Sequence, residues 1–196
     1  INKTSGKFST TVGSNAADWS ASHYTFGSWL ETDTWYHIAV VREGTAAGCF
    51  RLYVNGGLLD YYNYTTAIGN FDSAGLSIGA NVYSTDQLLY PVNGSVADFR
   101  WSKGLARYTE GGSVTTGATF TPPLTYSTTS WDTTTTTVAE PGYTPKFGIA
   151  SAVFDGDGDK LTVAANDSFT FAENEDYTVE GWIKTEQVGT SIVADT

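Results

Sequence analysis

Three aspartates alternate with glycines in the stretch FDGDGDKLTV, residues 154–163, and this pattern raises the question of a calcium site. Carboxylate oxygens are the ligands that Ca²⁺ prefers, and glycine lets a loop turn sharply around the ion. An EF-hand loop that begins at Asp155 needs glycine at its sixth position and glutamate at its twelfth. Lys160 and Asn166 occupy those positions, so the stretch is not an EF-hand loop.

The same stretch is explained without a metal ion as a strand, a glycine turn and a second strand. We expect Phe154 to face the core, and Leu161 and Val163 to return to it after the turn. A partial calcium site through Asp157 or Asp159 is the alternative. We therefore predict no cofactor for this chain, with calcium as the exception that an experiment has to test.

A second acidic run, ENEDYTVE at residues 173–180, suggests paired carboxylates for glycoside hydrolysis. Asp176 and Glu180 share a strand face but are four residues apart, roughly 13 Å at the rise of a strand. That separation exceeds the carboxylate spacing of both retaining and inverting glycosidases. We expect a structural role for His37, which lies inside the run WYHIAVV, and a small buried apolar side chain at Cys49. No catalytic residues are predicted, and the chain is not expected to be an enzyme.

The stretch ANVYSTDQLLY, residues 80–90, combines the side chains that proteins use to hold sugars. Aromatic rings stack on sugar faces, while Asn and Asp side chains orient hydroxyl groups. Asn81, Tyr83, Asp86 and Tyr90 are therefore the candidate carbohydrate-binding residues. The alternative is that this loop only joins two strands and that its tyrosines pack on the rim of the fold.

The elements that would position these residues are all strands. Alternating and fully apolar runs of strand length recur along the chain, and no segment keeps a helical period. Asn55-Gly56 between two such runs predicts a two-residue hairpin, since its turn needs positive φ at both residues. The expected strands are at residues 7–13, 23–29, 35–42, 49–55, 57–64, 76–82 and 94–102, and after the connector at SAVFDG, DKLTVAA, SFTF and residues 176–185. We expect the strand at 176–185 to be half-buried, because its residues alternate between two faces. This spacing predicts an all-β, two-sheet antiparallel sandwich with minimal helix.

The composition limits the partners. The 196 residues carry a net charge of −11, and a field of that sign repels phosphate backbones, so we expect no nucleic-acid binding. No apolar run is long enough to cross a bilayer, so we expect no membrane insertion. Threonine, serine and proline dominate residues 127–145, which we interpret as a connector.

Two blocks of spaced motifs carry a family resemblance. The block TWYHIAVVREG…FRLYVNGGLL…LSIGANV…GSVADFRWSKGLARYT…FTPPL resembles the later part of a laminin-G-like domain, of the concanavalin A-like lectin/glucanase superfamily. The block AVFDGDGDKLTV…SFTFAENEDYTVEGWIKT resembles the opening of the same domain. Together the blocks cover about residues 35–126 and 152–185, and the resemblance implies a jelly-roll sandwich.

The blocks stand in reversed order. We expect residues 1–126 to supply the later strands of a laminin-G-like sandwich, 127–145 to connect, and 146–196 to supply opening strands. These halves would complete one sandwich in cis or by exchange between chains, because an isolated half leaves a sheet face and edges bare. The alternative is that 146–196 starts the next repeat, in a window taken from a longer polypeptide.

The tail KGLARYT…FTPPLT is similar to a motif that recurs in laminin-G-like repeats of large virion proteins from marine tailed phages. This chain departs from it by inserting EGGSVTTGAT between Thr109 and Phe120. The resemblance implies a structural or adhesive module of a virion protein, extracellular in location, that contacts other virion subunits or repeats and host-surface glycan. The alternative is a carbohydrate-binding or adhesin module of a secreted or cell-surface bacterial protein.

Overall fold

The computed structural model of the chain describes residues 7–11, 23–45, 48–63, 76–84, 87–89, 91–109, 119–124, 146, 151–164, 175–186 and 194–195. Within these residues every regular element is a strand, and every strand pair is antiparallel. The predicted all-β antiparallel sandwich is confirmed. The described part of the chain contains no helix of the length and apolarity needed to cross a membrane.

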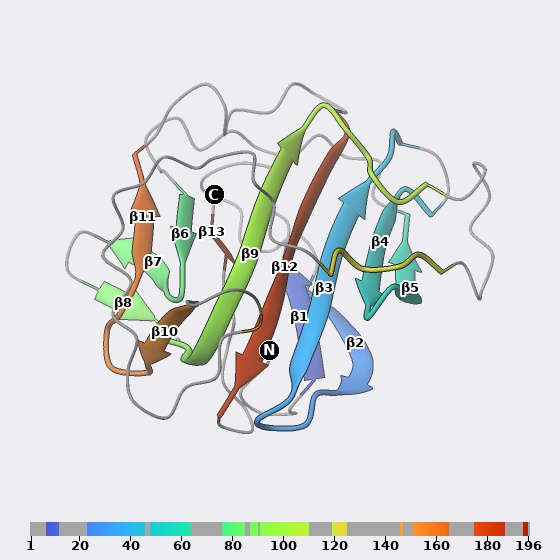
Figure 1. Ribbon diagram of the computed structural model, residues 1–196. Coiled ribbons are helices and arrows are strands. Elements are labelled where there is room, and N and C mark those ends of the chain that lie inside the picture. The colour runs from blue at the N-terminus through green and yellow to red at the C-terminus, as the bar shows by residue number, and fades with distance from the viewer. Residues whose placement is uncertain are drawn as a thin grey trace.

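A six-stranded sheet forms the main layer, and it runs across the centre of Figure 1. Its strands are, in spatial order, β10 (Ala152–Asp155), β9 (Asn93–Lys103), β12 (Tyr177–Thr185), β3 (Trp35–Arg42), β4 (Phe50–Val54) and β5 (Gly57–Tyr62). β12 comes from the last part of the chain, yet it lies between two strands of the first part and pairs with both.

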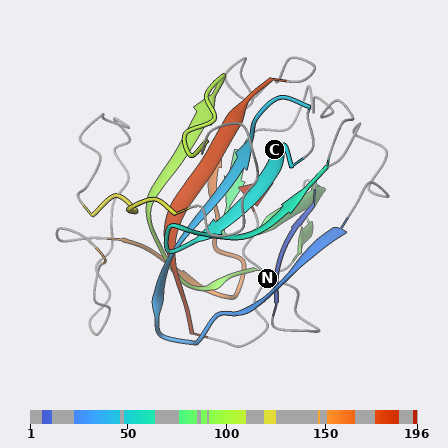
Figure 2. The same ribbon diagram turned by 90° about the vertical axis from the view of Figure 1, so that its right-hand side faces the viewer.

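Shorter strands complete the fold on one side of this sheet. β1 (Lys7–Thr11) and β2 (His23–Trp29) form a pair, and β7 (Asn81–Ser84) and β8 (Gln87–Leu89) form another. β6 (Leu76–Ile78) pairs with β11 (Leu161–Val163) on one edge and β13 (Ala194–Asp195) on the other. Figure 2 shows the β1–β2 pair behind one face of the main sheet and residues 119–124 on the opposite face.

Both faces of the six-stranded sheet are covered by apolar side chains. On the face toward β1 and β2, Ile38, Leu52 and Ile183 form one cluster, which Leu30 joins from the end of β2. On the other face Ala39, Val41 and Tyr53 pack against Ala106, Tyr108 and Phe120. These last three residues belong to two irregular segments, 104–109 and 119–124, which we call the outer cover.

The hairpin between β4 and β5 has the predicted form. Val54 pairs with Gly57, so Asn55 and Gly56 alone make the turn, with φ of 49° and 80°. The turn also supports the outer cover, since the Phe120 amide donates to the Gly56 carbonyl over 2.8 Å.

Two expectations about burial are wrong. β12 is not half-buried: its outward residues Thr178, Glu180, Trp182 and Lys184 are all 8% exposed or less. The outer cover is bonded to Thr178 and Trp182, and Lys184 is paired with Asp33. Leu161 does not return to the core and is 37% exposed, since the β11 strand that carries it pairs on one side only. Phe154 faces the core as expected, at 2% exposure.

Within the described residues β12 pairs with both β9 and β3. The division into later strands at 1–126 and opening strands at 146–196 stays a prediction, as does the alternative that 146–196 starts the next repeat. The predicted connector, residues 127–145, lies outside the described residues. Whether the halves also exchange between chains stays a prediction.

Gly56→Ala should destabilise the protein by about 2–4 kcal/mol, because alanine is strained at positive φ and its Cβ would overlap the Phe120 carbonyl. Gly44→Ala is the matched control: Gly44 also has positive φ, at 58°, but a Cβ there meets nothing within 4 Å. It should cost only about 1 kcal/mol. Urea unfolding measures both, and equal losses would contradict the contact between the hairpin turn and the outer cover.

Candidate functional site

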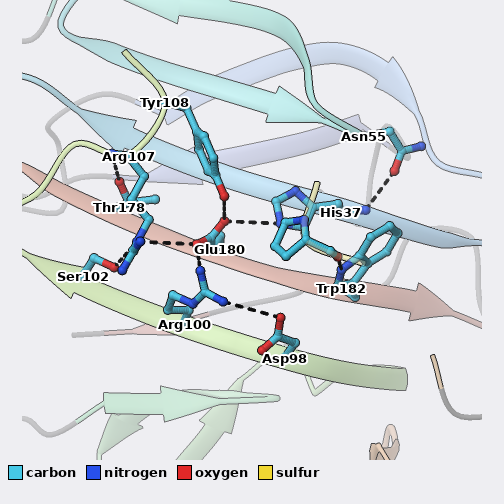
Figure 3. Close-up of polar contacts among 11 residues, drawn as sticks. His37, Asn55, Asp98, Arg100, Ser102, Arg107, Tyr108, Thr178, Glu180 and Trp182 are labelled. Atoms are coloured by element: carbon cyan, nitrogen blue, oxygen red, sulfur yellow. Dashed lines mark hydrogen bonds and ion pairs between the residues drawn. The ribbon is translucent and has the colours of Figure 1, made fainter. Parts of the chain in front are cut away.

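The largest set of interacting ionisable side chains in the described residues lies beneath the outer cover, with Glu180 at its centre (Figure 3). The Glu180 side chain is 1% exposed. One carboxylate oxygen, Oε2, lies 3.3 Å from His37 Nε2 and accepts a hydrogen bond from the Tyr108 hydroxyl. The other, Oε1, lies 3.2 Å from Arg100 Nη1 and 3.7 Å from Arg107 Nε. We call these five residues the Glu180 cluster.

Three strands and the cover bring the cluster together. Glu180 on β12 pairs with Ala39 on β3 and with Arg100 on β9, so alternation on the strands turns these side chains to the outer face. His37 is fixed through its main chain, since its amide donates to Asn55 Oδ1 over 2.9 Å. The hairpin turn thus positions one member of the cluster.

A bulge in β9 adjusts the strand that carries Arg100. The register shifts between Glu180 and Trp182, and Asp98 has a positive φ of 47°. Its carboxylate lies 3.8 Å from Arg100 Nη2. Bulges commonly redirect a side chain next to a polar site. Here the bulge places a second carboxylate beside the guanidinium that faces Glu180.

The cover is attached to β12 at the residues flanking Glu180. Thr178 Oγ1 accepts from the Arg107 amide over 2.9 Å and donates to the Leu105 carbonyl over 3.0 Å. The Trp182 indole donates to the Pro123 carbonyl over 3.1 Å. Each segment of the cover is therefore held by one outward side chain of the same strand.

Aromatic rings of the outer cover pack against the Glu180 cluster. The rings of Tyr108 and Phe120, one from each cover segment, stack with centroids 3.5 Å apart. The Tyr53 hydroxyl donates to the Tyr108 carbonyl over 2.8 Å. Phe120 and Trp182 both meet the His37 ring edge-on. Lys146 Nζ lies 3.9 Å from the centre of the Trp182 ring, a cation–π contact.

The charges in the cluster determine its protonation. Burial alone would raise the pKa of Glu180, but hydrogen bonds from His37 and Tyr108 and the charge of Arg100 outweigh it, and the pKa lies below its ordinary 4.5. Burial, followed by the hydrogen bond to Glu180 and its charge, raises the pKa of the Tyr108 phenol. Glu180 is therefore a carboxylate and Tyr108 a neutral donor at neutral pH.

His37 takes part through one nitrogen only. Its side chain is 1% exposed, and Nδ1 has no hydrogen-bond partner among the described residues. The neutral tautomer with a proton on Nε2 fits this geometry, since it donates to Glu180 and leaves no unpaired N–H. With that tautomer the charges balance, because Glu180 and Asp98 face Arg100 and Arg107.

Of the predicted carbohydrate-binding residues, the structure places only two. Asn81 and Tyr83 lie on β7, which forms a hairpin with β8. Asp86 and Tyr90 lie outside the described residues. The carbohydrate site stays a prediction.

The aspartates of residues 155–159 hold their own turn. The Asp157 amide donates to Asp155 Oδ1 over 2.7 Å, and the Asp155 amide donates to Asp159 Oδ2 over 3.1 Å. Gly156 and Gly158 have the positive φ that the bend needs. Within the described ranges no three His, Cys, Asp or Glu side chains are grouped to hold a metal ion. Calcium binding through Asp157 or Asp159 stays untested.

Asp176 and Glu180, which the acidic run suggested as paired carboxylates, have different partners in the structure. Asp176 Oδ1 accepts from the Gly44 amide over 2.7 Å, at the end of β12 and away from the Glu180 carboxylate. The prediction that Cys49 is a buried apolar side chain fits its 1% exposure. His37 occupies a buried structural position, as expected.

Arg100, Arg107 and Tyr108 were not singled out by sequence reasoning. One signal was available: Glu180 shares an outward strand face with Thr178 and Trp182, and a charged side chain on a central strand needs a partner. The partners could not be named, because they lie on other strands and on irregular segments 72–143 residues away.

The comparisons with known proteins agree with this architecture. A laminin G-type family of the concanavalin A-like lectin/glucanases superfamily matches residues 2–107 of the 196. The chain belongs to this superfamily. No curated protein and no solved structure matches the chain. The fold suggests a carbohydrate-binding or adhesive module, and domains of this lectin type are typically non-catalytic.

Glu180→Gln should lower the free energy of unfolding at pH 7 by about 3–5 kcal/mol, because it removes the buried charge that the partly buried guanidinium groups of Arg100 and Arg107 face. Asp33→Asn is the comparison: it breaks an ion pair with Lys184 in which the Asp33 side chain is 78% exposed. Its cost should stay below about 1 kcal/mol. Chemical denaturation measures both, and a Glu180→Gln loss no larger than that of Asp33→Asn would refute the structural role of the Glu180 cluster.

Proposed function

We propose that this chain is a non-catalytic structural or adhesive module of a phage virion protein, one that contacts host-surface glycan. The observation that carries the non-catalytic part is the sealed position of Glu180. A general acid or base must reach the substrate, directly or through one water. Glu180 is instead 1% exposed and holds four side chains of its own protein.

The adhesive part is supported by the superfamily to which the chain belongs and by the chemistry of residues 80–90. Asn81, Tyr83, Asp86 and Tyr90 are the proposed contacts, two of them on the β7–β8 hairpin at one side of the fold in Figure 1. The virion location is supported by the resemblance of residues 103–109 and 120–125 to the repeat motif of phage virion proteins. We propose other virion subunits or repeats of the same protein as partners.

A glycan array tests the adhesive role, with and without calcium in the buffer. We expect binding that Tyr83→Ala weakens by at least about tenfold, roughly 1.4 kcal/mol, because a stacking ring is lost. Tyr61→Ala is the matched control, since Tyr61 is an exposed tyrosine on β5, at 42%. Binding unchanged in Tyr83→Ala would place the site elsewhere, and a flat array under both conditions would leave a structural role alone.

Two further measurements separate the remaining classes. Release of reducing sugar from any bound glycan would overturn the non-catalytic proposal. Peptides of this chain in purified virus particles are the expected result of mass spectrometry. Their recovery in bacterial cell-wall or secreted fractions instead would favour a bacterial adhesin or carbohydrate-binding module.

A further inference from the structure

We propose that the Glu180 cluster is an acid-sensitive latch, which holds the outer cover on the six-stranded sheet at neutral pH and releases it on acidification. This inference concerns the opposite face from β1 and β2 and does not depend on the proposed function (Figure 2). The proposal follows from which charged side chains of the cluster lie on the sheet and which lie on the outer cover.

The cations of the cluster are divided between the sheet and the cover. Arg100 lies on β9 of the sheet, beside the imidazole of His37 on β3. Arg107 lies on the cover, and its side chain is 35% exposed, against 23% for Arg100. Arg107 is therefore the cation best able to leave for water.

The carboxylate of Glu180 is what these cations share. Its Oε1 lies within 3.7 Å of both guanidinium groups, and its Oε2 faces His37 and Tyr108 (Figure 3). Asp98 is the other carboxylate nearby, and it faces Arg100 on the side away from the cover. Lys146 contributes a further positive charge above Trp182. Removing the charge of Glu180 thus leaves Arg107 of the cover facing Arg100 of the sheet without the carboxylate between them, while Asp98 still faces Arg100.

Acidification removes that charge in a defined window. The folded pKa of Glu180 lies below 4.5, so its carboxylate stabilises the fold above its ordinary pKa, and this stabilisation is lost as pH falls through the folded value. Losing this charge makes the cluster more positive, and like charges in a poorly hydrated site repel strongly.

The sheet itself should survive this step. β12 is joined to β3 and β9 by main-chain pairing along its whole length. Its inward residues Tyr177, Val179 and Ile183 pack in the other core, away from the cluster. In the described residues the cover has no such run of pairing: it has one bridge, between Gly57 and Thr119, and main-chain hydrogen bonds from the Phe120 amide to Gly56 and from the Gly104 amide to Asp176. Release therefore exposes an aromatic surface, made by Tyr53, Trp182 and the inner side of the cover, on an intact sheet.

Hydrogen exchange of individual amides tests the latch in the 196-residue chain between about pH 2.5 and pH 7, corrected for intrinsic rates. The Arg107 and Phe120 amides report on the cover, because they donate to Thr178 and to the Gly56 carbonyl. Their opening constants should rise more than about tenfold on acidification. Amides of β12 and β3 should keep their protection. Simultaneous loss of protection in cover and sheet would overturn the proposal, as would no change in either.

Two variants assign the effect to the cluster. In Glu180→Gln the cover should already open more at pH 7, and its opening constant should then change less than about threefold across the pH range. Arg107→Gln, at a position whose side chain is 35% exposed, should also show a smaller acid response than the wild type. Lys160→Gln removes an exposed charge between β10 and β11 and should behave as the wild type. An unchanged acid response in Arg107→Gln overturns the proposal even if Glu180→Gln does not fold.

Discussion

A buried carboxylate on the central strand is the constraint that the outer half of this structure depends on. Taking one charge out of water costs several kcal/mol unless nearby donors and opposite charges replace the hydration shell. Glu180 is surrounded by two guanidinium groups, an imidazole and a phenol, so every element that carries one of them must be in place at once. The carboxylate therefore ties β3, β9, β12 and the outer cover into one cooperative unit.

This requirement gives the two irregular segments of the outer cover a structural role. KGLARYT supplies Arg107, Tyr108 and the carbonyl that Thr178 meets, and FTPPL supplies the ring and the carbonyl that face Tyr108 and Trp182. The alternate positions of TVEGW on β12 meet them in order. Glu180 and His37 are residue types that often perform acid–base chemistry, but here their positions give them a structural role. The spacing of Thr178, Glu180 and Trp182 follows the alternation of one strand face.

The sequence was sufficient for several strands and for one hairpin, because their signals are local. Apolar and alternating runs located β3, β4 and β9, and Asn55-Gly56 specified its turn through positive φ. The strand expected at 76–82 is divided between β6 and β7, and the stretch expected as a loop contains the β7–β8 hairpin. The outer cover could not be predicted from the sequence, and the reason is physical. Thr178, Glu180 and Lys184 are polar, and a polar side chain looks the same in sequence whether its partner is water or a distant arginine. For this reason the prediction that β12 is half-buried was wrong. The carbohydrate site stays a prediction, because two of its four candidate residues lie outside the described structure.

A polar cluster costs more to bury than an apolar one of equal volume, so its value must lie in something other than stability. Strand register is the property it specifies best. β12 lies between two strands, and its inward residues Val179 and Ile183 are apolar enough to pack in more than one alignment. A slip of one residue would turn Glu180 into the inner core and bring Val179 or Gly181 beneath Arg100, leaving charges unpaired on both faces. A slip of two would bring Thr178 or Trp182 there instead. Only the observed alignment satisfies Glu180, Thr178 and Trp182 together, so the cluster makes a strand from one end of the chain fit a single position among strands from the other.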